Sequence, residues 1–479
     1  MPRVIIRTDG NTQIGLGHLT RCIALSHMLK NDFEIVFACK HIPEQVEAET
    51  MKSGFQVRRI NNDKELFHHI NTEDIVVLDG YSFDVSYQKE IKAHGNMLVV
   101  IDDLHDQQYY ADLIINQAPS ATETEYIAQN YTRYSLGVDY ALLRPSFLAA
   151  AAANKEDHNM ENLLICFGGA DPKNLTEKVL KVVVNDVRFK KITVVTGCAY
   201  AFSDTLNEIL ARFSHVEHYS CLDESAMIQV IKKAGIAIVP ASGILFEILA
   251  VGCKAISGMY MDNQRIIYHQ FLNKGLIIDA GNFQEANVQT ALNSAVRESV
   301  NKRRPIDGRS GKRILKLFKA MHYQCRSSMR RATAEDLELT YGWATDESVR
   351  RFSFQKHKIT REEHERWFTR KLNDVNCLYY IFLIDKDEAG SIRFDIKDGS
   401  ATISYLLDPG YHGQGLGSML VEEGEKCLRN DIVNLSLPVR TLVGLVEESN
   451  IPSLKIFNHL GYRQVNDQGS LKFEKELVL

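Results

Sequence analysis

The sequence predicts an α/β protein in which two parallel sheets precede a smaller α/β domain. Over about the first 300 residues, short and nearly continuous apolar runs alternate with longer stretches of helical periodicity. Such runs are typical of strands buried on both faces, as in a parallel sheet flanked by helices. Residues 149–158 lack strand periodicity and separate two series of runs, so we expect two lobes with a cleft between them. The expected strands are Val4–Arg7, Ile35–Ala38, Ile75–Leu78, Met97–Ile101 and Leu113–Ile115, then Asn162–Phe167, Lys191–Thr196, Gly235–Val239 and Cys253–Ile256.

The length of 479 residues calls for two to four domains. We predict a first lobe at 1–150, a second lobe at 151–300, a basic linker or helix at 301–325 and a compact third unit at 326–479. The basic stretch is either a nucleic-acid patch or the solvated face of a helix, and we favour the helix face. Its cations are Lys302, Arg303, Arg304, Arg309, Lys312, Arg313, Lys316 and Lys319.

The composition argues against several classes of function. Apolar residues make up 45% of the chain and the formal charge is −5, so no overall basic field would attract nucleic acid or an anionic membrane. The N-terminus runs straight into a strand pattern, and no apolar run approaches the roughly 18 residues of a membrane span. The nine cysteines form no C-x-x-C pair, and apolar neighbours suggest that Cys166 and Cys253 are buried, reduced thiols. We therefore expect a cytoplasmic protein.

A glycine-rich turn in the third unit is the strongest local signal. A predicted strand ends at Leu407, the turn Pro409–Gly417 follows, and an amphipathic helix is expected over Ser418–Leu428. Glycines let backbone N–H groups approach an anion closely, and a helix N-terminus adds a positive dipole. The turn is therefore suited to a pyrophosphate.

A second segment makes the pattern more specific. Thr441–Val446 predicts a strand, and the helix that follows runs from the region of Asn450 to Gly461. This pair of segments resembles the GNAT N-acetyltransferase superfamily, over about Arg326–Leu479. The resemblance implies that acetyl-CoA is a co-substrate. The residues it implies for CoA are Leu407, His412, Gly413, Gln414, Gly415, Leu416, Gly417, Asn450 and Ser453.

Two residues depart from the GNAT pattern. His412 stands where the family has Arg or Gln at the start of the loop, a mild change because backbone groups do most of the holding. Phe457 stands where many members carry a general-acid tyrosine, and Tyr462, Tyr405 or solvent could replace it. The base that deprotonates the amine is equally open: Glu447 or Glu448 could serve, or both could be ordinary surface residues.

In the first lobe, a turn after the first strand carries Gly15-x-Gly17-His18-x-x-Arg21. A helix with an apolar face follows, so His18 lies at a helix N-terminus on the edge of the sheet where α/β folds bind ligands. A helix N-terminus disfavours the imidazolium and leaves a neutral ring able to accept a proton. The alternative is a capping or core histidine, which the glycine-rich context makes less attractive.

Two further strand-to-helix turns occur in the second lobe. The first contains Gly168 and Gly169, and the second begins at Ser242 and Gly243, which are free to donate to a diphosphate. Glu247 lies one turn inside the second helix among apolar residues. A carboxylate there needs a partner, either the hydroxyls of a ribose or a buried ion pair.

Together these segments resemble two Rossmann-like lobes of the GT-B type. More closely, they are similar to the family of UDP-2,4-diacetamido-2,4,6-trideoxy-β-L-altropyranose hydrolases of pseudaminic acid biosynthesis, over about residues 1–290. The segments that carry this resemblance are Asp9, Gly15–Arg21, Asp79–Tyr81, Asp102-Asp103, Leu136–Pro145, Gly168–Asp171, Glu247 and Asp262–Gln264.

The resemblance implies a metal-free attack of water at C1 of the sugar, with inversion and release of UDP. His18 would be the base, with Tyr81 and Asn263 lining the sugar site. The other residues implied for the substrate are Asp9, Gly17, Arg21, Arg144, Gly169, Ser242, Gly243, Glu247 and Gln264. A neutral histidine behind C1 and helix N-termini at the departing diphosphate agree with this chemistry.

The two resemblances reinforce one another, because the GNAT step and the hydrolysis would act on the same UDP-linked amino sugar. We expect a bifunctional enzyme that acetylates a 4-amino group and then releases UDP. One alternative is a GT-B glycosyltransferase with an acyltransferase domain, and another is a hydrolase with a non-catalytic CoA-binding module. The sequence leaves open the sugar stereochemistry, channelling between the sites and the oligomeric state.

Overall fold

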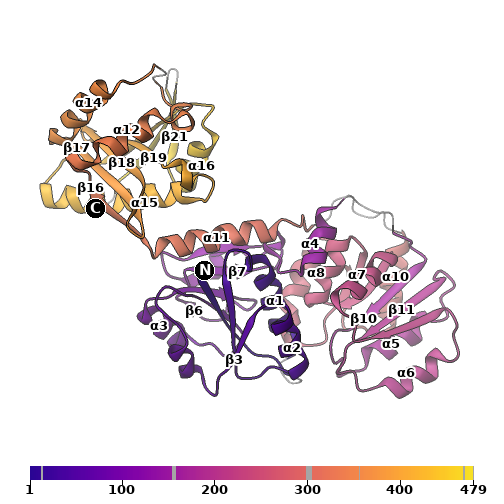
Figure 1. Cartoon of the computed structure of the whole chain (residues 1–479). Helices are drawn as coiled ribbons and strands as arrows, with labels where there is room; N and C mark the ends of the chain where they lie inside the picture. The colour runs from indigo at the N-terminus through magenta and orange to yellow at the C-terminus, as the bar shows by residue number, and fades with distance from the viewer. Residues whose placement is uncertain (12–14, 154–157, 298–304, 355–356, 468–469, 478–479) are drawn as a thin grey trace. The chain divides into compact units, whose positions relative to one another are not determined.

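The computed structural model describes residues 1–479 except 12–14, 154–157, 298–304, 355–356, 468–469 and 478–479 (Figure 1). The chain divides into two compact units, Met1–Leu315 and Lys316–Leu479. The helix α11 (Ser310–Gln324) carries the chain from one unit to the other.

The first unit begins with a seven-stranded parallel sheet in the order β3-β2-β1-β4-β5-β7-β9. Because β1 and β4 are neighbours while the chain runs outward from each in opposite directions, the sheet has a switch point between them, where α/β folds bind ligands. The strands are β1 (Arg3–Thr8), β2 (Glu34–Cys39), β3 (Gln56–Arg59), β4 (Ile75–Asp79), β5 (Met97–Ile101), β7 (Leu113–Asn116) and β9 (Arg133–Leu136); the helices are α1 (Gly17–Leu29), α2 (Glu44–Lys52) and α3 (Val85–His94); β6 (Gln108–Tyr109) and β8 (Ile127–Ala128) form a separate pair.

A second parallel sheet in the same unit has the order β12-β11-β10-β13-β14-β15. Its switch point lies between β10 and β13, so the turns after these two strands are neighbours. The strands are β10 (Asn162–Cys166), β11 (Lys191–Thr196), β12 (Val216–Ser220), β13 (Ile236–Pro240), β14 (Lys254–Gly258) and β15 (Ile278–Asp279); the helices are α5 (Leu175–Val183), α6 (Ser203–Leu210), α7 (Glu224–Lys233), α8 (Gly243–Val251), α9 (Arg265–Asn273) and α10 (Glu285–Arg297).

The helix α4 (Pro145–Ala152) packs against α8, beside which it is drawn in Figure 1. Its buried Phe147 belongs to the same apolar cluster as Phe246 of α8. The α8 helix is apolar on nearly all sides, with buried residues at seven successive positions from Leu245 to Val251. A helix of this kind is stable only where neighbours cover every face, and α4 supplies one of these covers.

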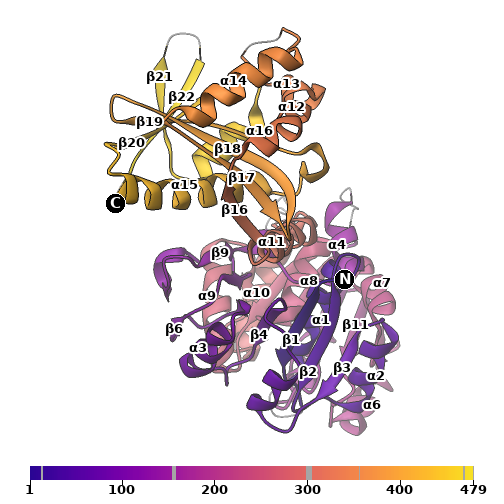
Figure 2. The same cartoon turned by 60° about the vertical axis from the view of Figure 1, so that its left-hand side comes forward.

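The second unit holds a mostly antiparallel sheet in the order β16-β17-β18-β19-β20-β22-β21. Figure 2 shows α15 on one side of this sheet and α12 and α14 on the other. The strands are β16 (Ser327–Arg331), β17 (Cys377–Ile384), β18 (Asp387–Lys397), β19 (Ser400–Leu407), β20 (Thr441–Val446), β21 (Arg463–Asp467) and β22 (Ser470–Glu476); the helices are α12 (Leu337–Thr345), α13 (Glu347–Arg350), α14 (Arg361–Asn373), α15 (Leu416–Leu435) and α16 (Ile451–His459).

One parallel pair interrupts this antiparallel sheet. Strands β19 and β20 pair only from Ser400–Thr441 to Ile403–Gly444, although both strands continue beyond this point. The last residues of β19, Ser404–Leu407, are therefore unpaired with β20, and the sheet opens into a wedge at this edge. Such an opening exposes backbone N–H and C=O groups to a ligand, because these groups are obligatory hydrogen-bonding partners.

The predicted mixed α/β architecture with parallel sheets is confirmed, and each expected strand lies within or overlaps an observed one. The helix expected at Ser418–Leu428 is longer and spans Leu416–Leu435. The predicted domain boundaries at 150, 300 and 325 stay predictions. No described helix is long and apolar enough to cross a membrane.

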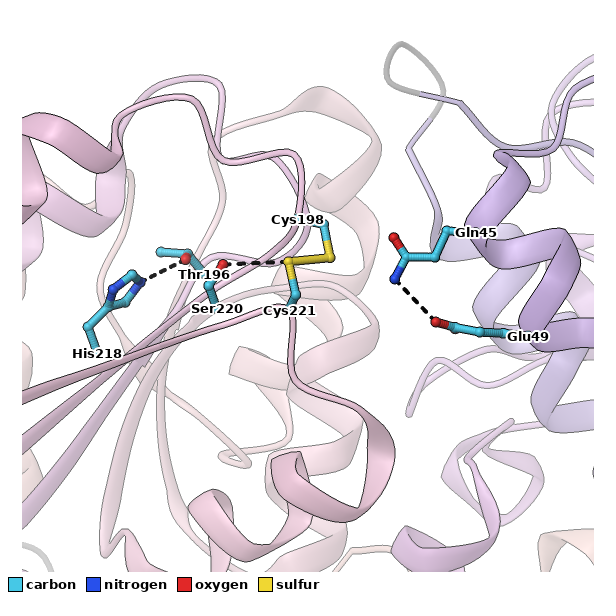
Figure 3. The surroundings of a disulfide bond; sticks show 7 residues. All are labelled: Gln45, Glu49, Thr196, Cys198, His218, Ser220 and Cys221. Carbon is cyan, nitrogen blue, oxygen red and sulfur yellow. Dashed lines mark hydrogen bonds between the residues drawn. A yellow bond between two sulfur atoms is a disulfide. The ribbon is translucent and has the colours of Figure 1, made fainter. Parts of the chain in front are cut away.

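The expectation about cysteines is correct for Cys166 and Cys253, which are buried and form no disulfide. It misses a disulfide between Cys198 and Cys221, shown in Figure 3. These residues follow β11 and β12, which are adjacent in the second sheet, so their Cα atoms lie 4.9 Å apart although 23 positions separate them. The pairing was invisible in the sequence because only the parallel register of the two strands brings the loops together.

Candidate functional sites

A buried carboxylate, Asp79, lies at the centre of the first site. It is the last residue of β4 and is fully shielded from solvent. Arg21 donates to both of its oxygens, at 2.7 Å from Nε to Oδ2 and 2.6 Å from Nη2 to Oδ1. Burial alone would raise the pKa of Asp79, but Arg21 and His18 outweigh it and hold the pKa well below the ordinary range. Asp79 is therefore an anion at every physiological pH.

His18 is oriented by this carboxylate. Its Nδ1 lies 2.7 Å from Asp79 Oδ1, and its ring is 7% exposed at the N-terminal turn of α1. Arg21 Nη2 also lies 3.2 Å from Nδ1. At 2.7 Å, a lone pair on Nδ1 would be repelled by the lone pairs of Asp79 Oδ1. Nδ1 therefore carries a proton that it donates to the ionised Asp79. In the neutral form of the ring this contact selects the tautomer with its lone pair on Nε2, as a general base requires.

Tyr81 covers the histidine from the side. Its ring meets that of His18 edge to face, with centroids 4.7 Å apart, and half of the residue is exposed. Burial raises the pKa of Tyr81 to about 12, and Asn263, which directly precedes α9 in the second lobe, acts on this hydroxyl in the opposite direction. The structure thus places Tyr81 against His18, and that Asn263 lines the same site stays a prediction.

Other predicted residues of the first lobe have partners within the protein. Asp9 accepts from Arg7 Nη2 at 2.6 Å and from the backbone N–H groups of Lys40 and His41. Burial opposes ionisation of Asp9, yet Arg7 and the two N–H groups lower its pKa. Asp9 therefore joins the ends of β1 and β2. Gly17 begins α1, and a side chain there would meet nothing within 4 Å, so the start of this helix is open.

The two predicted turns of the second lobe differ in what they offer an anion. After β10, the buried Asp171 accepts from the N–H groups of Leu175 and Thr176 at 2.9 and 2.7 Å. This carboxylate occupies the N-terminus of α5, leaving only the backbone around Gly169 for a phosphate. The N-terminus of α8 differs, since no side-chain cap and no acidic first-turn residue occur there among the described residues. It suits an anion better.

Ser242 and Gly243 form that open terminus. A side chain at Gly243 would meet nothing within 4 Å, which indicates free space above the helix. The backbone N–H of Ser242 already donates to Pro240 O at 2.8 Å. The chain turns sharply at the strand end, so Ser242 would donate to a diphosphate through its hydroxyl, and its predicted role stays a prediction.

Glu247 and Arg144 form the buried ion pair that the sequence left as an alternative. Arg144 donates from Nε and Nη2 to the same oxygen, Oε1, at 3.0 and 2.7 Å. The pair joins the start of α4 to α8. Burial raises the pKa of Glu247, and Arg144 only partly opposes this. Gln264 is also buried, and its Oε1 accepts from the N–H of Tyr260 at 2.9 Å.

The second site lies at the wedge between β19 and β20 in the other unit. Across this opening, the Tyr405 hydroxyl lies 2.8 Å from Ser453 Oγ. Asn450 caps α16 by accepting from the N–H of Ser453 at 3.2 Å. Burial raises the pKa of Tyr405 to about 12, although the bond with Ser453 lowers it. Tyr405 thus remains a protonated hydroxyl at the site.

The glycine-rich turn lies beside this wedge. Gly413 and Gly415 have φ angles of 76° and 83°, in the left-handed region that favours glycine. Gly415 is the N-cap of α15, which has no side-chain cap and no acidic first-turn residue among the described residues. A side chain at Gly417 would meet Ile456 at 2.6 Å, so α15 packs closely on α16. The first turn of α15, which includes Leu416, is suited to a pyrophosphate.

The side chains of the turn bind within the unit. His412 Nε2 lies 3.0 Å from Leu407 O, and Gln414 accepts from the Tyr323 hydroxyl at 2.6 Å. These contacts fix the loop while its backbone stays available. Asp408, just before it, accepts from Trp343 Nε1 at 2.8 Å and from the N–H of Gly410 at 2.7 Å. The sequence did not predict that Asp408 and Trp343 hold the start of this turn.

Phe457 is a core residue, 2% exposed, stacked on Phe473 at 5.5 Å and packed under Gly444. Of the alternatives to the missing tyrosine, Tyr462 is buried and donates to Glu425 at 2.7 Å. Tyr405 is instead hydrogen-bonded across the wedge. The geometry therefore favours Tyr405 over Tyr462.

The sequence reasoning also missed the roles of Asp79 and Asp103. Asp79 fixes His18, and Asp103 accepts from Arg21 Nη1 at 2.6 Å. The usable signal was an acidic residue ending a strand next to β1, since the carboxyl ends of parallel strands meet at one edge. Among the described residues, no group of three or more His, Cys, Asp or Glu side chains is placed to hold a metal ion.

Comparisons with known proteins agree with the division of the chain into two units. Residues 326–463 match the family model of the acetyltransferase (GNAT) domain. An uncharacterized protein of Methanocaldococcus jannaschii is 26% identical over 96% of this chain and 97% of its own length. The spore coat polysaccharide biosynthesis protein SpsG of Bacillus subtilis is 25% identical over 58% of this chain and 83% of its own length.

The UDP-2,4-diacetamido-2,4,6-trideoxy-β-L-altropyranose hydrolase of Campylobacter jejuni is 23% identical over 58% of this chain and 98% of its own length. Both resemblances expected from the sequence are therefore confirmed. The chain combines a region similar to this hydrolase with a C-terminal GNAT domain.

The raised pKa of Glu247 predicts a pH-dependent stability. A carboxyl whose pKa is higher in the folded state stabilises the fold when protonated, so this contribution is lost as pH rises above the ordinary value of about 4.3. Chemical denaturation at several pH values should show wild type losing stability relative to Glu247→Gln between about pH 4.5 and 7. Glu208→Gln, on the exposed side of α6, is the control. A wild-type advantage over Glu247→Gln that grows with pH would contradict the assignment.

Proposed function

We propose that the chain is a bifunctional enzyme that N-acetylates a UDP-linked amino sugar and then hydrolyses the acetylated product to free sugar and UDP. The observation that carries the hydrolase half is the His18–Asp79–Arg21 cluster at the switch point of the first sheet. It lies in the region similar to the Campylobacter jejuni hydrolase. The GNAT match and the wedge beside the glycine-rich turn support the acetyltransferase half.

In the proposed hydrolysis, His18 Nε2 removes a proton from a water molecule that attacks C1 of the sugar. The bond between C1 and the diphosphate oxygen breaks, and UDP leaves with the bonding electrons. Asp79 stabilises the imidazolium that forms and holds the ring in place. Attack from the face opposite the leaving group inverts the configuration at C1.

The diphosphate would lie at the open N-terminus of α8, near Ser242 and Gly243, with the backbone at Gly169 beside it. Tyr81 and Asn263 would line the sugar. Because these two belong to different lobes and Asn263 acts on the pKa of the Tyr81 hydroxyl, we propose a GT-B-like arrangement in which the sugar is bound between two lobes. No step of this proposal calls for a metal ion.

In the proposed acetyl transfer, the turn Gly413–Gly417 binds the pyrophosphate of acetyl-CoA. The amine of the sugar attacks the thioester carbonyl, and the C–S bond breaks to release the CoA thiolate. The protonated Tyr405 hydroxyl then donates a proton to this thiolate, while the acylated nitrogen loses one proton to solvent and solvent reprotonates Tyr405. The substrate we propose is a UDP-linked 4-amino-4,6-dideoxy sugar, and the availability of acetyl-CoA and UDP-sugars leads us to propose a cytoplasmic reaction.

Replacing His18 should abolish UDP release while acetylation continues. A proton NMR time course of UDP-4-amino-4,6-dideoxy-N-acetyl-β-L-altrosamine with acetyl-CoA separates the two steps. Loss of a general base lowers the rate about 10²–10⁴-fold, so His18→Ala should accumulate the acetylated UDP-sugar. His68→Ala, at an exposed position of the same unit, should resemble wild type. UDP release at the wild-type rate by His18→Ala would refute the assignment.

Replacing Tyr405 should have the opposite effect. Tyr405→Phe keeps the ring but removes the proposed proton donor, so CoA release should slow by about 10²-fold or more. UDP release from the sugar acetylated beforehand should be unchanged. Tyr341→Phe in the same unit is the matched control. If Tyr405→Phe acetylates as fast as wild type, solvent rather than this hydroxyl protonates the thiolate; if wild type never acetylates, the domain is a CoA-binding module.

A further inference from the structure

A small pocket lies beside His18 and is not used by the mechanism above. It is lined entirely by residues of the first lobe, among them Arg21, Tyr81, Gln88 and Asp103, and has a volume of about 30 Å³. A cavity of this size admits one or two groups as large as a water molecule. It is therefore suited to one small substituent of a sugar rather than to a nucleotide.

Two polar atoms in this lining lack partners among the described residues. Asp103 is 6% exposed, and while its Oδ2 accepts from Arg21, its Oδ1 is buried without a hydrogen bond. Gln88 is fully buried, and while its Oε1 accepts from the N–H of Tyr110, its Nε2 has no acceptor. A buried polar atom left unpaired is costly, so each such atom indicates a missing partner.

The charge of the pocket excludes a phosphate. Among the described residues Arg21 is the only cation that lines the pocket, and Asp79 and Asp103 already share its guanidinium. Asp102 and Asp106 are further lining carboxylates, and Asp102 accepts from the hydroxyls of Tyr109 and Tyr126 at 2.7 and 3.1 Å. The pocket is therefore suited to a group that donates a hydrogen bond.

The unpaired atoms are complementary to one kind of group. Asp103 Oδ1 is an acceptor and Gln88 Nε2 is a donor. An amide carries a donor N–H and an acceptor C=O on adjacent atoms, whereas an ammonium has no acceptor for the glutamine. A hydroxyl could satisfy both atoms only by turning its single hydrogen to one of them. An amide therefore carries the kind of partner that each of the two unpaired atoms lacks.

We propose that this pocket is a subsite for an acetamido group on the sugar ring, with Asp103 accepting from its N–H and Gln88 donating to its carbonyl. The inference rests on the proposed function and adds a positioning role for two residues. The subsite would favour the acetylated sugar over the free amine, so that acetylation precedes hydrolysis.

Equilibrium affinity tests this proposal without relying on turnover. Isothermal titration calorimetry would use the full chain with His18→Ala, so that the sugar is not consumed, and the same chain with Asp103→Asn added. The probes are the UDP-diacetamido sugar, its 4-amino precursor and UDP. Asn can keep one bond with Arg21 but turns an N–H toward the amide N–H. We expect the affinity for the diacetamido sugar to fall about tenfold or more and the affinity for UDP to stay unchanged.

A second variant protects the test against misfolding. Gln88→Glu keeps the acceptor for the N–H of Tyr110 but replaces the donor by a carboxylate oxygen. The affinity for the diacetamido sugar should therefore fall, and the affinity for the 4-amino precursor should rise. This reversal is not expected of a purely structural defect. Equal losses of affinity for UDP and for the diacetamido sugar, or no loss of affinity in either variant, would mean that the pocket holds only water. Either result would overturn the proposal. Failure of wild type to release UDP would instead count against the proposed hydrolysis, and the affinities would still decide on the subsite.

Discussion

The first unit is organised around one buried anion. Asp79 could not remain ionised out of water without compensation, and Arg21 and His18 provide it through three hydrogen bonds. Because Arg21 and His18 are one turn apart on α1, the same contacts fix the rotation of this helix against β4. Removing one partner from a buried pair typically costs about 3–5 kcal/mol. The carboxylate thus couples the stability of the lobe to the orientation of its proposed base.

Sheet topology explains why the candidate residues gather where they do. In the first sheet the chain leaves β1 toward His18 and leaves β4 toward Tyr81, and these strands are neighbours. In the second sheet the turns after β10 and β13 are neighbours in the same way. In the GNAT domain the site forms in another way, because β19 and β20 separate after four paired positions and leave Tyr405 at the opening. All three places put loops and helix N-termini at the end of strands, where backbone N–H groups are available.

Much of this architecture follows from the sequence, because continuous apolar runs and strand-to-helix glycine turns are local signals. The turn at Gly413–Gly417 and the position of His18 needed only neighbouring residues to be found. Contacts between distant segments were beyond such reasoning. The pairing of Asp79 with His18 depends on β1 and β4 being adjacent, and that of Arg144 with Glu247 depends on α4 packing against α8. Asp171 shows the same limit, since a predicted phosphate turn proved to carry its own buried cap.

The protonation of His18 can be measured directly. Two-bond nitrogen–proton correlation spectra of the chain labelled with ¹⁵N-histidine would contain 16 rings, and His18→Ala identifies the signal of His18. In the neutral ring the Asp79 contact predicts a proton on Nδ1 and a bare Nε2, and Asp79→Asn should change this pattern. A protonated Nε2 in wild type, or a spectrum of His18 that Asp79→Asn leaves unaltered, would contradict the view that the buried carboxylate prepares this histidine as a base.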